Sequence, residues 1–183
     1  MSKGRGGAKS AAQSVSLMAM MTALAFVLSW IESLFPPVFL AVPGIKLGLA
    51  NVVVLMMLYV GGLAQAGVVS LVRVLMVGLV FASPSAMLFS LAGGALSLSV
   101  MALVKRAGWF SPMGVSMLGG VCHNVGQMLC HAALMGVFLT PYLPLMLASG
   151  AIAGAATGLL AAAIRPRLKR YGDANKPENA CKV

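Results

Sequence analysis

The side chains of this chain that could do chemistry are few, and they fall within or beside long apolar segments. Eight of them are polar or ionisable: Glu32, Lys46, Asn51, Arg73, His123, Asn124, Gln127 and His131. Positions 123, 127 and 131 are four residues apart, so on a helix they share one face, with position 124 beside it. Guanidinium and imidazole groups suit carboxylates and phosphates, and Glu32 is the lone acid set against Arg73 and Lys46. The set therefore predicts a binding pocket for a small anionic molecule.

Other uses of these residues are open. Arg73 could simply pair with Glu32, and the histidine and amide groups could hydrogen-bond to neighbouring helices, because ionisable groups inside a membrane usually need a partner. A metal site is not expected, since His123 and His131 lie about 12 Å apart along one helix and carboxylate ligands are scarce. No catalytic residue and no cofactor is predicted.

The composition places these residues in a membrane. The chain has 183 residues, of which 60% are hydrophobic and 9% charged, with a mean hydropathy of +0.97. Soluble domains carry roughly 25% charged residues. We therefore expect an all-α integral membrane protein, a compact bundle of about six transmembrane helices of roughly 20 residues each.

Proline and glycine punctuation divides the chain into these helices. We expect a flexible cytoplasmic tail at residues 1–11, a six-helix membrane domain at 12–165 and a flexible basic cytoplasmic tail at 166–183. The predicted spans are residues 13–34, 47–59, 64–81, 86–104, 113–138 and a last one from Pro141–Pro144 to Ile164. The first could pass for a signal peptide, but its apolar run continues through Ile31 without a polar break.

Charge bias predicts the orientation of the bundle. With both termini in the cytoplasm, the inside holds eleven basic residues: Lys3, Arg5, Lys9, Lys105, Arg106, Arg165, Arg167, Lys169, Arg170, Lys176 and Lys182. The outside holds only Lys46. Cytoplasmic flanks collect Lys and Arg, which explains the net charge of +10 without nucleic acid. The pocket would then lie in the outward half of the bundle.

Small residues mark places where helices meet closely. Gly150, Gly154 and Gly158 repeat every fourth position in the last span, which favours close backbone packing in lipid, and Ala162 extends the row. Ala19 and Ala23 form a weaker row in the first span, open to packing or to partner docking. Three cysteines, Cys122, Cys130 and Cys181, make no disulfide framework and are expected to be free thiols.

Two local motifs carry a family resemblance. With Arg73, the stretches Pro43–Asn51 and Gly119–Gln127 resemble the Gx transporter family, whose members are often called heptaprenyl diphosphate synthase component I. That family is similar to the substrate-binding S components of energy-coupling-factor vitamin transporters. The resemblance implies six helices, a ligand in the outward half, and docking of a coupling membrane subunit on an A-x-x-x-A row that Ala19 and Ala23 match.

A catalytic role does not fit the residues. Prenyl diphosphate synthases hold Mg²⁺ on aspartate-rich motifs, and this chain has three acids in all. It also has no phosphate-loop motif, so ATP hydrolysis would need another polypeptide. The leading hypothesis is a substrate-binding subunit of an uptake transporter in a bacterial cytoplasmic membrane, for an anionic or vitamin-like molecule, with partner coupling and ATPase subunits. The alternatives are a non-catalytic accessory subunit in prenyl diphosphate or quinone synthesis and a membrane component of a redox system.

Overall fold

The computed structural model describes residues 3–34, 48–136 and 140–174, with side chains in 12–34, 48–136 and 141–164. All regular structure in these ranges is helical. The elements are α1 (Lys3–Leu34), α2 (Leu49–Val60), α3 (Gly62–Val80), α4 (Pro84–Ala107), α5 (Pro112–Met135), the short 3₁₀ turn η1 (Thr140–Tyr142) and α6 (Leu143–Ala174). The prediction of an all-helical chain is confirmed for the described residues.

Helices α4 and α5 begin and end with the same local signals. Each starts with a serine N-cap followed by proline, and the serine side chain accepts a hydrogen bond from a backbone N–H of the first turn, at 3.2 Å for Ser83 and 3.3 Å for Ser111. Each ends at a glycine with positive φ, 74° at Gly108 and 67° at Gly136. These signals fix where the two helices turn back on each other.

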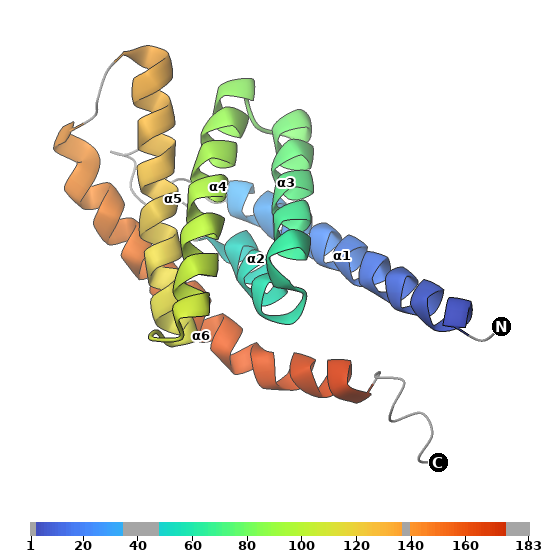
Figure 1. Ribbon diagram of the computed structural model, residues 1–183. Coiled ribbons are helices and arrows are strands. Elements are labelled where there is room, and N and C mark those ends of the chain that lie inside the picture. Colours follow the sequence, from blue (N-terminus) through green and yellow to red (C-terminus); the bar gives the residue numbers. More distant parts are fainter. Residues whose placement is uncertain (1–2, 35–47, 137–139, 175–183) are drawn as a thin grey trace.

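Figure 1 shows how the helices are arranged. Helices α3, α4, α5 and α6 run alternately up and down, with α5 between α4 and α6. Helix α1 crosses behind this row at a large angle, and the short α2 lies between α1, α3 and the lower part of α6. Among the described residues, contacts between neighbouring helices therefore form a ring in the order α3, α4, α5, α6 and α2.

Glycines bring α5 and α6 into backbone contact. A Cβ built on Gly150 would lie 2.7 Å from the carbonyl oxygen of Gly120, and one on Gly154 would lie 2.5 Å from that of Ser116. At Gly158 the nearest atom is the Cα of Met113, at 2.7 Å. The predicted glycine row thus faces another helix at close range. Ala162, which we expected to extend the row, is exposed.

Helix α2 forms the core of the lower end. Its residues 52–58 are all buried, and Leu55, Met57 and Leu58 are almost completely so. They pack with buried side chains of α1, α3, α4, α5 and α6 in one cluster. Lipid tails are as apolar as these side chains, so close packing rather than exclusion from water holds α2 in place.

The outer surface is apolar. Leu79, Leu103 and Ile152 are 81%, 65% and 71% exposed, and such side chains are costly in water. Among the described residues, four helices are long and apolar enough to cross a membrane: Ala12–Leu34 in α1, α3, α4 and Leu143–Ile164 in α6. These are four of the six spans that the sequence predicts. Helix α2 has 12 residues, about 18 Å at 1.5 Å per residue, against a hydrocarbon thickness of about 30 Å.

The two terminal helices are longer than we predicted. Helix α1 continues back to Lys3, where a flexible tail at residues 1–11 was expected, and α6 continues to Ala174, past the predicted end at residue 165. Once an apolar span has nucleated a helix, each further residue costs only propagation. The extensions run through Gly4, Gly6 and Pro166 in spite of the low helix propensity of these residues. The location of these ends in the cytoplasm remains a prediction.

Candidate functional site

A cavity of about 710 Å³ lies inside the ring of helices. All six α-helices and η1 contribute side chains or backbone to its wall. Along α5 the wall runs from Ser116 to His131, about 22 Å at 1.5 Å per residue. The cavity therefore extends over most of the height of the bundle, whereas we expected a pocket confined to one half.

The structure brings most of the predicted site residues to this cavity. Seven line it, from four helices: Glu32, Asn51, Arg73, His123, Asn124, Gln127 and His131. Lys46, the eighth, lies outside the described residues. The convergence arises because the helical face of α5 that carries the polar residues points into the ring. Their role in binding remains a prediction.

Arg73 is the central charge of the cavity. Its Nε is buried and has no hydrogen-bond partner among the described residues. Glu32 attracts it electrostatically, but the two form no ion pair in the part of the chain that the structure describes. The Arg73–Glu32 ion pair, which the sequence left open as an alternative to ligand binding, is therefore absent from the described residues. An Arg side chain inside a membrane costs about 2.5–3.5 kcal/mol even on the lenient insertion scale, so an unpaired buried Nε on this group calls for an explanation.

Glu32 serves a different group. Its Oε1 accepts a hydrogen bond of 3.0 Å from the backbone N–H of Leu49, the first residue of α2. Gly48 precedes it with a φ of 77° and offers no side chain to cap the helix. A carboxylate at a helix N-terminus satisfies a free N–H and complements the helix dipole. Glu32 thus replaces the missing N-cap from another helix.

Lys105 complements the opposite end of α2. Its Nζ donates a 2.6 Å hydrogen bond to the carbonyl oxygen of Leu58 and lies 4.9 Å from the ring centroid of Tyr59. A cation at the C-terminal carbonyls is favourable for the same reason that an anion is favourable at the N-terminus. Both ends of α2 are therefore held by charges from neighbouring helices.

The polar residues of α5 divide into bonded and free groups. Asn124 Nδ2 donates to the carbonyl oxygen of Met146 at 2.5 Å and to Ser149 Oγ at 3.4 Å, both on α6. His131 differs, because its Nδ1 is buried without a hydrogen-bond partner among the described residues. Its ring lies 5.5 Å from that of Phe89. Asn124 thus holds helices together, while His131 retains an unused polar atom.

Sequence reasoning missed a set of hydroxyl groups in the wall. Eight serines line the cavity: Ser29, Ser70, Ser83, Ser85, Ser90, Ser97, Ser116 and Ser149. Ser116 and Thr157 also share a hydrogen bond of 2.7 Å between α5 and α6. A signal was present in α4, where Ser90, Gly94, Ser97 and Met101 follow helical spacing and all line the cavity. Hydroxyl groups donate and accept hydrogen bonds without adding charge.

The remaining predicted positions lie away from the cavity. Ala19 and Ala23 are both exposed on α1. Cys122 and Cys130 are free thiols, as expected, and Cys181 lies outside the described residues. Among the described residues no group of three His, Cys, Asp or Glu could hold a metal ion.

Comparison with known proteins gives one family. A protein-family model with the description heptaprenyl diphosphate synthase component I matches residues 21–164. The match covers α1 from Met21, all of α2 to α5 and the apolar part of α6. No curated protein and no solved structure matches the chain. The resemblance to proteins of that name, inferred from two local motifs and Arg73, is confirmed.

Proposed function

The chain belongs to the heptaprenyl diphosphate synthase component I family, and we propose that it is a non-catalytic membrane subunit that binds a small anionic molecule in its central cavity for uptake into the cell. One observation carries the proposal: Arg73 Nε is buried at the cavity without a hydrogen-bond partner among the described residues. Buried polar atoms are rarely left unpaired, so each one needs an explanation, and the explanation that we propose here is a bound ligand.

The shape and chemistry of the cavity support this function. A volume of about 710 Å³ falls in the range of small-molecule sites, roughly 300–1,000 Å³. A guanidinium group offers paired donors to a carboxylate or phosphate, and the serine hydroxyls can bond the rest of the ligand. Glu32, the only acid among the described residues of the wall, is already bonded to the N-terminus of α2.

Uptake would require partners. The sequence has no phosphate-loop motif, so we propose that a coupling membrane subunit and ATPase subunits supply the energy. The exposed positions Ala19 and Ala23 on α1 would dock the coupling subunit. We place the protein in a bacterial cytoplasmic membrane with both ends inside, because the basic residues cluster on one side of the predicted topology.

The family description favours a second candidate function. A subunit named component I implies an assembly, and a non-catalytic membrane subunit of a prenyl diphosphate synthase would fit the scarcity of acids. Such a subunit would present an apolar groove to lipid, whereas the polar groups of this chain converge inside the ring. We therefore prefer the binding function.

The test is the set of small molecules that co-purify with the protein. Arg73→Gln removes the charge and keeps hydrogen-bonding capacity, so it should lose the anionic species that wild type retains, and Arg73→Lys should restore them only in part. Arg106→Gln is the matched control, because Arg106 is exposed at the end of α4 and does not line the cavity. Mass spectrometry of the three variants and wild type measures the loss. Equal anion content in wild type and Arg73→Gln would contradict the proposal.

A further inference from the structure

Two buried side-chain nitrogens lack a hydrogen-bond partner in the described residues, and both border the same cavity. They are Nε of Arg73 on α3 and Nδ1 of His131 on α5. A neutral imidazole donates a hydrogen bond from one nitrogen and accepts one at the other, so the unpaired Nδ1 can bond either an acceptor or a donor of a ligand. Leaving such an atom unpaired costs about 1–3 kcal/mol. The two atoms therefore mark two contacts that the protein itself does not fill.

Contacts between α3 and α4 set the height of Arg73. A Cβ built on Gly78 would meet the side chain of Met87, and one on Gly94 would lie 3.6 Å from Ser70 Oγ. The two helices run in opposite directions, so the residues of α3 between Ser70 and Gly78 lie opposite the residues of α4 between Gly94 and Met87. Arg73 thus lies at the level of the turn of α4 that precedes Gly94.

Contacts between α4 and α5 show which residues of α5 lie at the same height as Arg73. A Cβ built on Gly126 would lie 2.9 Å from the Cα of Gly93 and from the carbonyl oxygen of Ala92. Arg73 is therefore level with Gly126 and Gln127 on α5. His131 is one helical turn farther along, about 6 Å at 1.5 Å per residue. One small molecule can span that axial offset.

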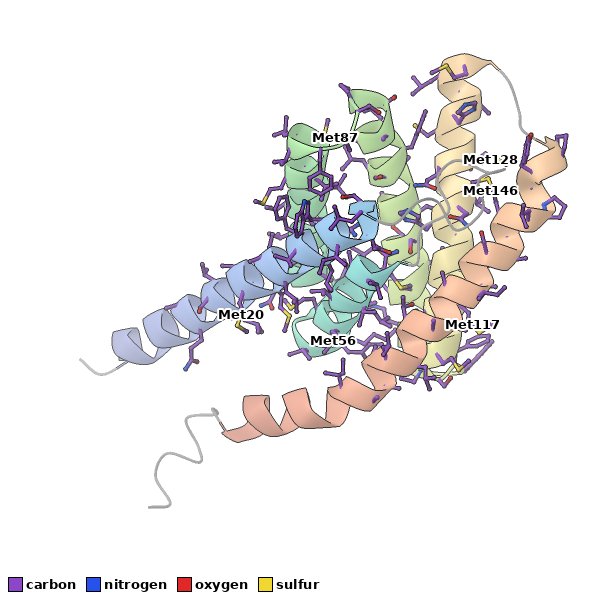
Figure 2. The ribbon with its side chains drawn as sticks, turned by 180° about the vertical axis from the view of Figure 1, so that it is seen from behind. Met20, Met56, Met87, Met117, Met128 and Met146 are labelled. Atoms are coloured by element: carbon purple, nitrogen blue, oxygen red, sulfur yellow. The ribbon has the colours of Figure 1, made fainter. Side chains whose placement is uncertain are left out.

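The cavity wall near His131 includes aromatic side chains. Phe89 lies against the imidazole with ring centroids 5.5 Å apart and planes tilted by 46°. Both residues line the cavity, as does Tyr142. Aromatic faces and edges pair favourably with another ring. Methionines Met87, Met128 and Met146, labelled in Figure 2, also line this region, and thioethers adapt well to aromatic surfaces.

We propose that the cavity selects a ring-bearing anion, with its carboxylate or phosphate on Arg73 and a flat ring against Phe89 that presents a hydrogen-bonding atom to His131. This inference rests on the proposed anion-binding function and adds the substrate class. The volume of about 710 Å³ leaves room for a further substituent on the ring.

Four probe molecules test the three parts of the proposal on the purified full chain. They are 3-hydroxybenzoate, benzoate, cyclohexanecarboxylate and 3-hydroxybenzamide, titrated calorimetrically into protein in lipid nanodiscs. We expect 3-hydroxybenzoate to bind about five- to tenfold more tightly than benzoate, the effect of one net hydrogen bond. Benzoate should bind more tightly than cyclohexanecarboxylate, which lacks a flat ring, and the neutral amide should not bind.

Variants assign each preference to its residue. His131→Phe keeps a ring beside Phe89 but removes the nitrogen, so 3-hydroxybenzoate should fall to the affinity of benzoate while benzoate stays within about twofold. Leu129→Phe is the matched control, because Leu129 is 52% exposed on α5 and does not line the cavity. It should retain the full preference. Arg73→Gln should abolish binding of both acids.

The outcomes separate this inference from the proposed function. If wild type binds benzoate and cyclohexanecarboxylate with equal affinity, the proposed preference for a flat ring is wrong. If His131→Phe still binds 3-hydroxybenzoate more tightly than benzoate, the proposed hydrogen bond to His131 is wrong. If no probe acid binds while Arg73→Gln still loses the co-purified anions, the ring-bearing class is wrong and anion binding stands. If no probe acid binds and Arg73→Gln keeps those anions, both proposals fail.

Discussion

At the scale of single residues, Glu32 shows how burial changes the role of a charge. Its carboxylate could have neutralised Arg73 or contacted a ligand, yet it bonds the first N–H of α2. Gly48 provides no capping side chain there, so the helix end would otherwise be left unsatisfied inside the protein. The capping bond engages Glu32 and leaves Arg73 without a hydrogen-bonded counter-ion in the described chain.

Replacing Glu32 should therefore destabilise the ligand-free protein. Glu32→Ala removes the capping acceptor and should cost about 1–2 kcal/mol, and Glu32→Gln, which keeps a neutral acceptor, should cost less. The measurement is thermal unfolding in detergent. Ser33→Ala is the neighbouring control, because Ser33 is exposed and bonds only within its own helix.

A double mutant separates capping from charge pairing. If Glu32 mainly caps α2, Glu32→Ala should destabilise the Arg73→Gln variant by as much as it destabilises wild type. Loss of the effect in the Arg73→Gln background would show that Glu32 acts chiefly on Arg73.

At the scale of elements, α5 is the helix around which the site is built. One side packs against α4 through Gly93 and Gly126, and the other against α6 through Gly120, Gly150 and Gly154. In lipid the hydrophobic effect does not draw helices together, so close backbone contact is a main source of their association. Together with the α3–α4 contacts of Gly78 and Gly94, the α4–α5 contacts set a register in which Arg73 is level with Gln127 along the helix axes.

Replacing a glycine by alanine should lower the stability only where the glycine contacts the backbone of a neighbouring helix. Gly154→Ala places a Cβ 2.5 Å from the carbonyl oxygen of Ser116, and such overpacking costs about 1–3 kcal/mol. Gly94→Ala is the matched control, because its Cβ would make an ordinary contact of 3.6 Å with Ser70 Oγ. Thermal unfolding in detergent should be lowered only in Gly154→Ala. Similar midpoints for the two variants would mean that α5 and α6 are not in backbone contact.

At the scale of the whole molecule, the ring of helices separates an apolar exterior from a polar interior. The outer surface carries Leu79 and Ile152, 81% and 71% exposed, while Arg73, Gln127 and His131 line the cavity inside. Trp109, 87% exposed in the turn after α4, stands beside Lys105 and Arg106. Aromatic and basic residues are typical of a membrane interface on the cytoplasmic side.

Topology can be tested with reporter fusions. A reporter after residue 183 should be cytoplasmic, and one inserted between residues 36 and 46 should be outside, because eleven basic residues fall on the predicted inner side. A reporter in the turn at Gly108 provides an internal check and should also be cytoplasmic. An external C-terminus would exclude an even number of spans with the N-terminus inside.

Partner docking on α1 gives a second test at this scale. Ala19 and Ala23 are exposed, so bulky replacements should fold normally but lose a coupling membrane subunit on co-purification. The double variant Ala19→Leu/Ala23→Leu should elute and unfold like wild type. A control on another exposed face is Ala156→Leu on α6. Full retention of the partner by the double variant would assign the alanine row to lipid contact.

The sequence alone determined what depends on local order along the chain. Apolar runs and the proline and glycine residues between them indicated the helices, and the four-residue spacing on α5 placed three polar side chains on one face. These features are local, so neighbouring residues suffice to define them. The resemblance was also readable from two short motifs and Arg73.

Only the tertiary structure decided which of these groups are free. The capping bond of Glu32, the bond of Asn124 to α6 and the idle nitrogens of Arg73 and His131 depend on how far apart helices stand and in which register. Register is set by glycine contacts between segments distant in sequence, such as Gly78 with Met87 across a turn or Gly120 with Gly150 across two helices. Apolar side chains do not indicate this register in the sequence, because in lipid many ways of pairing two helices bury these side chains equally well.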